Sequence, residues 1–303
     1  MGQTVRRTPG RAREFGTRLL RLGLLSGAAW FLWSGLAGSG GGPMACLQEA
    51  RGESRLPAPP NGSPSAGLDL RNFLYAETKH FILYCHPGLT PATLAWVQHF
   101  LETTYREVVQ YMGLAFDRPV VVILYTEAAY EAERRRRRVP EWGGAMYDGR
   151  VHLPVPNARP IPTTLRRRLR HELCHAVLDR FTLGQAPLWL HEGAAYGCEY
   201  MDDPAFLEDA FQDLLERQAV PPADVLRQPS YAALGEKAAR DVYVAASQWL
   251  QYLVHQYGRD LFDRWLDRMA QGRPWEIAFR DVYGADFSNL YEAWRTGRLT
   301  TGP

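Results

Sequence analysis

The feature that most constrains the fold is the stretch HELCHAVLDRFTLGQAPLWLHEGAAYGCE, residues 171–199, which places two His-Glu pairs twenty residues apart. Apolar residues recur at helical spacing on both sides of Gly184 and Pro187, so the stretch predicts two helices joined by a loop. That loop is long enough for the second helix to fold back beside the first. The chain must therefore bury an apolar helix pair that also carries two histidines and two glutamates.

The first His-Glu pair has the spacing of a metal site. His171 and His175 are four residues apart and share one helical face, so their imidazoles can bind one metal ion. Glu172 lies one step round the helix, as in the HExxH pattern, where the glutamate is the general base of a zinc hydrolase. Zinc with an open coordination position needs a third protein ligand. A third histidine six residues further on is excluded because position 181 is Phe, whereas Glu192 is available on the second helix.

With HELCH and WLHEG together, the chain resembles the gluzincin zinc metallopeptidases, and among them the bacterial peptidase-MA-like domains, over roughly residues 143–200. The resemblance implies a zincin-like fold, a peptide or protein substrate and one Zn²⁺ ion. It implies His171, His175 and Glu192 as metal ligands and Glu172 as the base.

Two further residues lie next to the predicted ligands. His191 points about 100° away from Glu192 on the helix, so it is interpreted as a bystander that is exposed or contacts substrate. Glu199 follows Glu192 by seven residues on the same face. It is either a hydrogen-bond partner for the outer nitrogen of a ligating histidine or a surface residue at a helix end.

The segment GGAMYDGRVHLP, upstream of the helix pair, has a hairpin turn signal at Asp148-Gly149. The resembled enzymes place here an edge strand that holds the substrate backbone by β-addition. GAMYD is similar to the GAMEN of zinc aminopeptidases, but Tyr147 replaces the Glu that would bind a free amino terminus. Internal cleavage is therefore favoured. The predicted substrate-binding residues are Gly144, Ala145, Met146 and Tyr147.

A later helix completes the predicted site. The resemblance implies a Tyr or His from such a helix that stabilises the oxyanion, and Tyr243 in RDVYVAASQWLQYLVHQYG is the candidate by its position. With 15 tyrosines in the chain, other tyrosines compete for this role.

The order of elements predicts an α+β fold: a small mixed β-sheet subdomain with an edge strand, then a mostly helical half that carries the metal site. The first part has apolar runs typical of strands and one long amphipathic helix. The expected strands are 80–85 and 119–126, the expected helix is 91–113, and an Arg-rich helix ends at Pro140 before the hairpin. Helices are expected at about 163–182, 187–201, 203–217, 239–257, 259–271, 274–282 and 287–296.

The N-terminal segment has the pattern of an export signal. Basic residues precede an apolar run at 22–38, which predicts a signal peptide or N-terminal membrane anchor over residues 1–45. Cys46 follows small residues as in a bacterial lipoprotein box. A flexible Gly/Pro/Ser linker is predicted at 46–67 and the metallopeptidase domain at 68–300. These features predict a protein of the bacterial cell envelope that is exported and either anchored to the membrane or secreted.

The remaining features leave alternatives open. The net charge of +2 indicates no strong electrostatic partner, and the Arg runs at 134–138 and 166–170 are interpreted as solvated helix faces, so nucleic acid is not an expected partner. Cys174 and Cys198 either form a disulfide or are small buried residues. The main functional alternative is a catalytically inactive zinc- or peptide-binding module of the envelope.

Overall fold

The first half of the described chain builds a mixed β-sheet and the helices that pack on it. The computed structural model describes residues 48–49, 70–115, 118–140, 144–157 and 161–301. The sheet has the strand order β1-β2-β3-β4-β6-β5, in which β3, β4 and β6 are parallel and the other neighbours are antiparallel. The strands are β1 (Gln48–Glu49), β2 (Leu74–Glu77), β3 (Phe81–Cys85), β4 (Val120–Tyr125), β5 (Met146–Tyr147) and β6 (Val151–Pro154).

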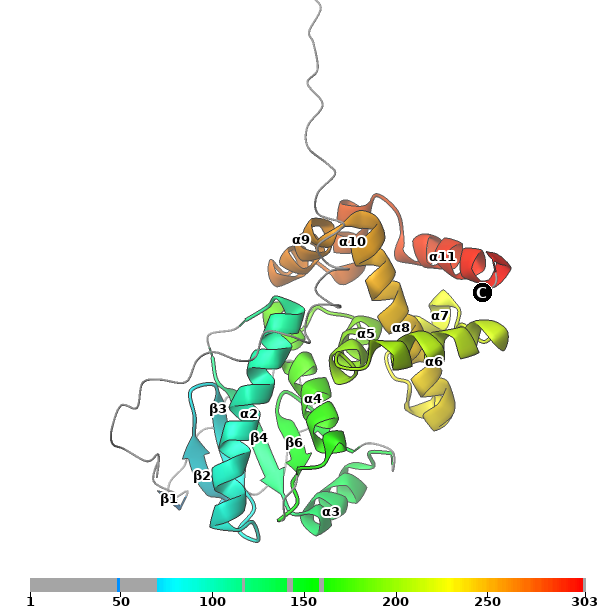
Figure 1. Ribbon diagram of the computed structural model, residues 1–303. Coiled ribbons are helices and arrows are strands. Elements are labelled where there is room, and N and C mark those ends of the chain that lie inside the picture. The colour runs from blue at the N-terminus through cyan, green and yellow to red at the C-terminus, as the bar shows by residue number, and fades with distance from the viewer. Residues whose placement is uncertain (1–47, 50–69, 116–117, 141–143, 158–160, 302–303) are drawn as a thin grey trace, which may run out of the picture. The chain divides into compact units, whose positions relative to one another are not determined.

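Strand β4 lies in the middle of the sheet and is buried on both faces, as its run of β-branched residues predicts. Alternate residues, beginning with Val120, pack in the main core with helices α2 (Pro91–Met112) and α4 (Thr163–Phe181). The residues between them, beginning with Val121, pack in a second cluster with Tyr130 of α3 (Glu127–Arg137). The sheet is therefore covered on both faces, with α2 and α4 along one of them (Figure 1).

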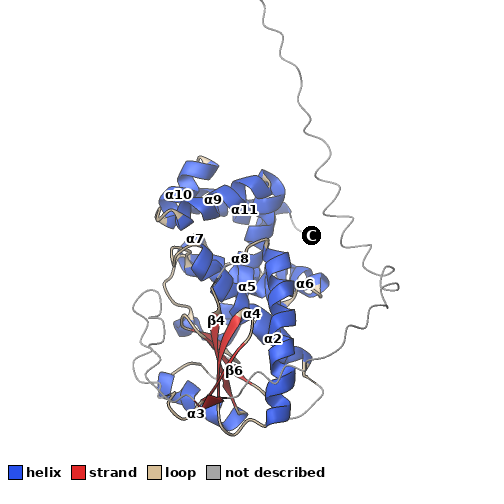
Figure 2. Ribbon diagram, turned by 90° about the vertical axis from the view of Figure 1, so that its left-hand side faces the viewer, coloured by secondary structure: helices blue, strands red, loops and turns tan. Residues whose placement is uncertain are grey.

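The second half of the chain is helical and gathers at one end of the sheet (Figure 2). Helix α5 packs between α4 and α8, the two helices with which it makes its most extensive contacts. The elements are α5 (Leu188–Glu199), α6 (Pro204–Glu216), α7 (Ala223–Leu226), the 3-10 helix η2 (Ala232–Leu234), α8 (Gly235–Tyr257), α9 (Arg259–Ala270), α10 (Trp275–Tyr283) and α11 (Phe287–Thr301).

Trp189 fixes the start of α5 in this helical half. Its indole is fully buried and stacks on Phe287 at a centroid distance of 4.8 Å and on Trp265 at 5.6 Å. Burial of an aromatic side chain of this size stabilises a fold by about 3 kcal/mol or more. Since Glu192 follows one helical turn later, this packing also sets the position of its carboxylate.

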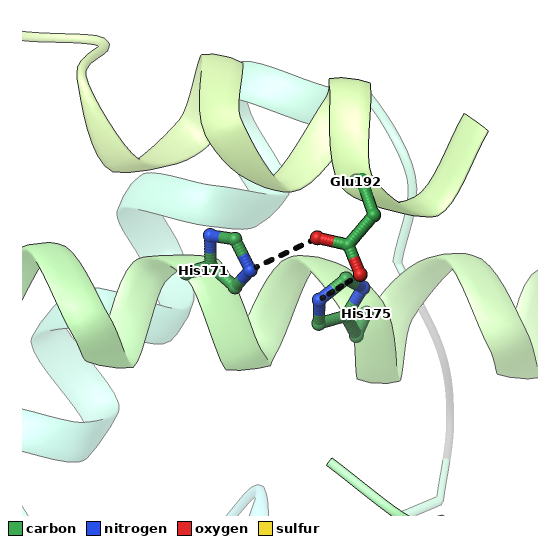
Figure 3. Close-up of side chains that lie close together, drawn as sticks. All are labelled: His171, His175 and Glu192. Carbon is green, nitrogen blue, oxygen red and sulfur yellow. Dashed lines mark ion pairs between the residues drawn. The ribbon is translucent and has the colours of Figure 1, made fainter. Parts of the chain in front are cut away.

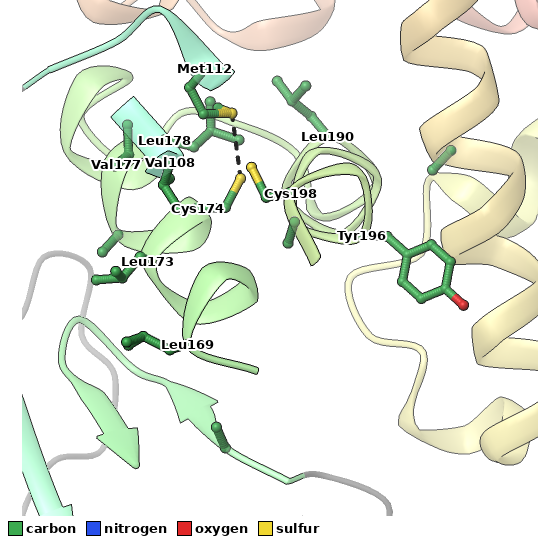
Figure 4. Close-up of a cluster of buried hydrophobic side chains, with 14 of the residues drawn as sticks. Val108, Met112, Leu169, Leu173, Cys174, Val177, Leu178, Leu190, Tyr196 and Cys198 are labelled. Atoms are coloured by element: carbon green, nitrogen blue, oxygen red, sulfur yellow. Dashed lines mark hydrogen bonds between the residues drawn. The ribbon is translucent and has the colours of Figure 1, made fainter. Parts of the chain in front are cut away.

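The opposed faces of α4 and α5 share a dry apolar contact that includes Cys174 and Cys198 (Figure 4). Both cysteines are fully buried free thiols, and the Cys174 thiol donates to Met112 Sδ at 3.6 Å. The interpretation of these cysteines as small buried residues thus agrees with the structure, and no disulfide crosslinks the two helices.

The predicted α+β class is confirmed, with the sheet first and the helical half second. The strand β2 was not predicted, nor were the short α7 and η2, and α8 begins four residues before the expected position at 239. The predicted leader at 1–45 lies outside the described residues, as does most of the linker at 46–67, of which only β1 is described. None of the helices in the described ranges has both the length and the apolar character that crossing a bilayer requires.

Candidate metal centre

One face of α4 forms the floor of a large cleft. Apolar residues of this helix such as Leu169 and Leu173 are buried in the core that also holds residues of β4 and β6. On the other side of α4, residues that recur every three or four positions line a cleft of about 860 Å³. These residues are Thr164, Arg167, Arg168, His171, Glu172, His175 and Asp179.

His171 and His175 meet Glu192 of α5 in this cleft (Figure 3). One ligand atom from each residue lies within 4.8 Å of the other two. His171 Nε2 is 3.5 Å from Glu192 Oε2, and His175 Nε2 is 4.0 Å from Glu192 Oε1. Each of these side chains is between 11% and 16% exposed, so the group is shielded yet open to the cleft. Two imidazoles and a carboxylate facing a common point are a donor set that could hold a divalent metal ion.

Glu199, at the end of α5, lies behind His171. Its Oε2 is 3.0 Å from His171 Nδ1. A carboxylate at this distance favours the tautomer in which Nδ1–H donates to Glu199, which leaves the Nε2 lone pair facing Glu192 and the cleft. Without a metal ion, burial lowers the pKa of His171, but the hydrogen bonds to Glu192 and Glu199 outweigh it and raise that pKa well above its usual value.

Glu172 points into the same cleft and is only 7% exposed. Burial, reinforced by the nearby carboxylates of Glu192 and Glu199, raises its pKa to about 7, although the charge of His171 opposes the shift. A carboxyl group with this pKa can both accept and return a proton near neutral pH.

His191 lies close to His175 with its ring centroid at 5.5 Å, but it does not belong to the cluster that could bind metal. Burial lowers its pKa to about 4, so its imidazole is neutral at physiological pH. It lines the cleft, so the expectation that it contacts substrate stays a prediction.

Helix α8 approaches α5 closely because of Gly193. A Cβ at position 193 would lie 2.7 Å from the carbonyl carbon of Ala246, a distance at which the two helices would have to separate. This contact brings Tyr243, one turn before Ala246, close to the group formed by His171, His175 and Glu192, called below the metal-binding group because it could hold a metal ion. The ring of Tyr243 is 6.4 Å from that of His171, centroid to centroid. Burial and the proximity of Glu192 raise the pKa of Tyr243 above its usual value, so the phenol remains a donor.

The other tyrosines of the cleft have hydroxyl groups that are hydrogen bonded to groups other than the two histidines and Glu192. Tyr231 donates to the carbonyl oxygen of Leu226 at 2.6 Å, and Tyr147 donates to Asp179 Oδ2 at 2.9 Å. The hydroxyl of Tyr196 is hydrogen bonded to that of Tyr200. The hydroxyl of Tyr243, by contrast, is hydrogen bonded to Glu192, so Tyr243 is the phenol that lies against one of the three candidate ligands.

Strand β5 borders the cleft as the last strand of the described sheet, paired with β6 along only one of its edges. Two contacts fix its course along α4. Gly144, just before β5, lies against Arg168, and Tyr147 lies against His175, with the rings nearly parallel and 6.2 Å apart. The edge strand therefore passes the histidines of α4, and both of its residues line the cleft.

The structure brings all the predicted site residues into this one cleft. They are Gly144, Ala145, Met146, Tyr147, His171, Glu172, His175, Glu192, Glu199 and Tyr243. Sequence reasoning missed Asp179, Tyr196 and Tyr231. The first two follow a predicted ligand by four residues and could have been found from helical spacing. Tyr231 comes from a loop and has no such signal.

Comparison with known proteins gives one family. A family model described as the Peptidase MA superfamily matches residues 108–299, which is more than half of the chain and includes α4, α5 and α8. No curated protein matches the chain.

Proposed function

The chain belongs to the peptidase MA superfamily, and from this premise we propose that it is a zinc-dependent peptidase that cleaves internal peptide bonds. The observation that carries the proposal is the meeting of His171, His175 and Glu192 at the floor of a cleft that also holds the buried carboxyl of Glu172.

The donor set fits zinc. Tetrahedral zinc has Zn–N and Zn–O distances of about 2.1 Å, so its ligand atoms lie about 3.4 Å apart. The separations of 3.5 Å and 4.0 Å between the histidine nitrogens and the Glu192 oxygens require only small side-chain adjustments to reach this value. Three protein ligands leave one position for water or substrate, as in catalytic rather than structural zinc sites.

The proposed chemistry assigns each residue one task. When bound, zinc supplies Lewis acidity, which makes water acidic near neutral pH and polarises the scissile carbonyl. Glu172 accepts a proton from the attacking water and then returns it to the nitrogen of the leaving amine. Tyr243 donates a hydrogen bond to the carbonyl oxygen as negative charge develops there. Glu199 holds the ring of His171 in the required tautomer.

The proposed substrate is an extended peptide that adds to the free edge of β5. Backbone hydrogen bonds to Met146 and Tyr147 would position it across the histidines of α4. Tyr147 donates its hydroxyl to Asp179 and offers no carboxylate to a free amino terminus. Internal cleavage is accordingly proposed over aminopeptidase activity.

Metal analysis combined with a proteolysis assay tests this function. The full chain, purified in mild detergent, should contain about one zinc ion and hydrolyse casein or a peptide library, and a chelator should abolish hydrolysis until zinc is restored. Glu192→Ala should lose both zinc and activity. Stoichiometric zinc without hydrolysis of any peptide would instead favour the inactive binding module.

Export to the bacterial envelope, by a cleaved or lipidated leader or by a retained anchor, is a separate proposal that rests on the sequence of residues 1–46. The intact mass of the native protein tests it. A mass equal to that of the unprocessed chain would contradict cleavage and lipidation at Cys46.

A further inference from the structure

Arg168 differs from the other arginines of α4. Arg166 and Arg170 pair with Glu107, and Arg167 pairs with Asp203. Arg180 donates to the carbonyl oxygens of residues 118 and 119. By contrast, no ion pair joins Arg168 to any other residue in the described ranges, although its side chain lines the cleft.

The guanidinium of Arg168 lies against the segment that leads into β5, because the residue there is a glycine. A Cβ at position 144 would lie 2.8 Å from Arg168 Nη2 and closer still to Nε and Cζ. Any residue larger than glycine would displace the guanidinium. Gly144 thus leaves room for a cation directly beside the segment that enters β5.

The position of Arg168 on α4 fixes how far it lies from the reacting bond. It precedes His171 by three residues, so its Cα is about 4.5 Å from that of His171 along the helix axis. An extended peptide advances by about 3.3 Å per residue. A substrate held along β5 would therefore bring one of the first two residues on one side of the cleaved bond to Arg168.

Among the described residues that line this cleft, the other arginines are already paired. Arg167 pairs with Asp203 and stacks on Tyr200, and Arg240 pairs with Glu236. The carboxylates of the cleft floor belong to the metal-binding group and its neighbours. A substrate carboxylate would be repelled by those groups but attracted by Arg168, whose planar guanidinium can donate two parallel hydrogen bonds to it.

We propose that Arg168 determines specificity by binding a carboxylate of the substrate within two residues of the cleaved bond. This inference rests on the proposed function and adds the class of substrate. The carboxylate comes either from an Asp or Glu side chain inside the peptide or from a C-terminus close to the cleaved bond, and the two sources require separate substrates.

The test compares matched peptides. The first set is amidated at the C-terminus and carries Glu, Gln or Lys at one of the two positions on either side of the cleaved bond. The second set is neutral and ends within two residues of that bond, as a free carboxylate or as an amide. Hydrolysis is measured as kcat/KM for the full-length wild type and for R168Q, R168E and R166Q. R166Q removes an exposed arginine of the same helix that does not line the cleft.

The wild type should prefer the carboxylate in at least one set by roughly 3- to 10-fold, the range expected for a partly exposed bidentate pair. R168Q should bring this ratio to about one, R168E should favour Lys over Glu, and R166Q should retain the preference. The proposal is overturned if the wild type prefers the carboxylate in neither set, or if R168Q keeps the wild-type ratio.

Measurements of peptide binding test the role of Arg168 independently of whether the protein is a peptidase. The same peptides are titrated against E172Q and against E172Q/R168Q by fluorescence anisotropy, which requires no turnover. Absence of hydrolysis by the wild type would count against the proposed peptidase, while an Arg168-dependent preference in binding would still support the carboxylate site. Equal affinities of the two variants for the carboxylate peptides would overturn the proposed carboxylate site.

Discussion

Replacement of Glu199 by Gln should weaken zinc binding without removing a direct ligand. The substitution keeps an oxygen that can accept from His171 Nδ1 but removes the charge, 3.0 Å from that nitrogen. Loss of a partner of this kind costs about 10- to 100-fold in metal affinity. That range corresponds to about 1.4–2.7 kcal/mol. Both side chains are less than 20% exposed, so solvent screening is limited and the larger half of the range is expected.

The size of the effect should depend on pH, because Glu199 also helps to hold a proton on His171. Its hydrogen bond contributes to the raised pKa of His171 in the metal-free protein, where the proton competes with zinc. Well above that pKa the proton on His171 is absent, and the variant shows the full loss of zinc affinity. Below that pKa, zinc must displace the proton from His171. The wild type holds this proton more tightly than the variant does, so its zinc affinity falls more. The difference in apparent affinity should therefore narrow as the pH falls.

Competition with a chromophoric chelator measures the zinc affinity of the full chain at pH 8.5 and pH 6. Glu216→Gln, an exposed change of the same type on α6, is the control and should match the wild type at both values. The reasoning fails if Glu199→Gln binds zinc within twofold of the control at both pH values, or if the loss of zinc affinity is larger at pH 6 than at pH 8.5.

Four further outcomes are expected. Glu172→Gln should lower kcat by about 10²- to 10⁴-fold with zinc content unchanged, as metal analysis beside a peptide assay would report; substantial residual activity would exclude it as the base. Tyr243→Phe should lower kcat by about 10²-fold with little change in KM, and an unchanged kcat would assign the oxyanion to another donor. Gly193→Ala should destabilise the fold by about 1–3 kcal/mol and lower the Tm by several degrees, because the new methyl group meets the α8 backbone at 2.7 Å. Burial opposes ionisation of Asp148, but its hydrogen bonds to a buried histidine and an arginine hold its pKa at about 2. The ionised carboxylate of Asp148 therefore stabilises the fold above about pH 3.8, and this stabilisation is lost as the pH falls toward 2. Asp148→Asn should lower the free energy of unfolding in urea by about 2 kcal/mol at pH 7 and by little at pH 2.

The grouping of His171, His175 and Glu192 was predictable because its information is local. His171 and His175 are related by one helical turn, and the third ligand follows on the next helix after a loop signalled by Gly184 and Pro187. The helix boundaries expected for α4 and α5 differ from those of the structure by no more than two residues. Helical spacing and turn residues were sufficient here because the ligands lie one turn apart on α4 and the loop residues mark where α5 begins.

The surroundings of the metal-binding group depend on contacts between segments far apart in the sequence. Tyr243 was chosen by its position alone, yet what brings it to the cleft is the approach of Ala246 to Gly193, which no periodicity encodes. The strand β2 was missed because its four residues, LYAE, are too few to set a pattern before the turn that follows. Asp179 carried a usable signal, but its importance depends on Tyr147, 32 residues away in the sequence.

Local helical spacing and contacts between distant segments determine two different parts of the proposed enzyme. The chemistry lies on α4 and α5, where helical spacing alone aligns the ligands and the base. The choice of substrate lies where β5 crosses α4, and there only the folded chain places Gly144 beside Arg168 and Tyr147 beside His175. Substitutions at 144, 147 or 168 can therefore change which peptide is cut while the residues that cut it stay in register. For this reason the proposed substrate class rests on the crossing of β5 and α4, whereas the proposed metal ligands bear only on the proposed reaction.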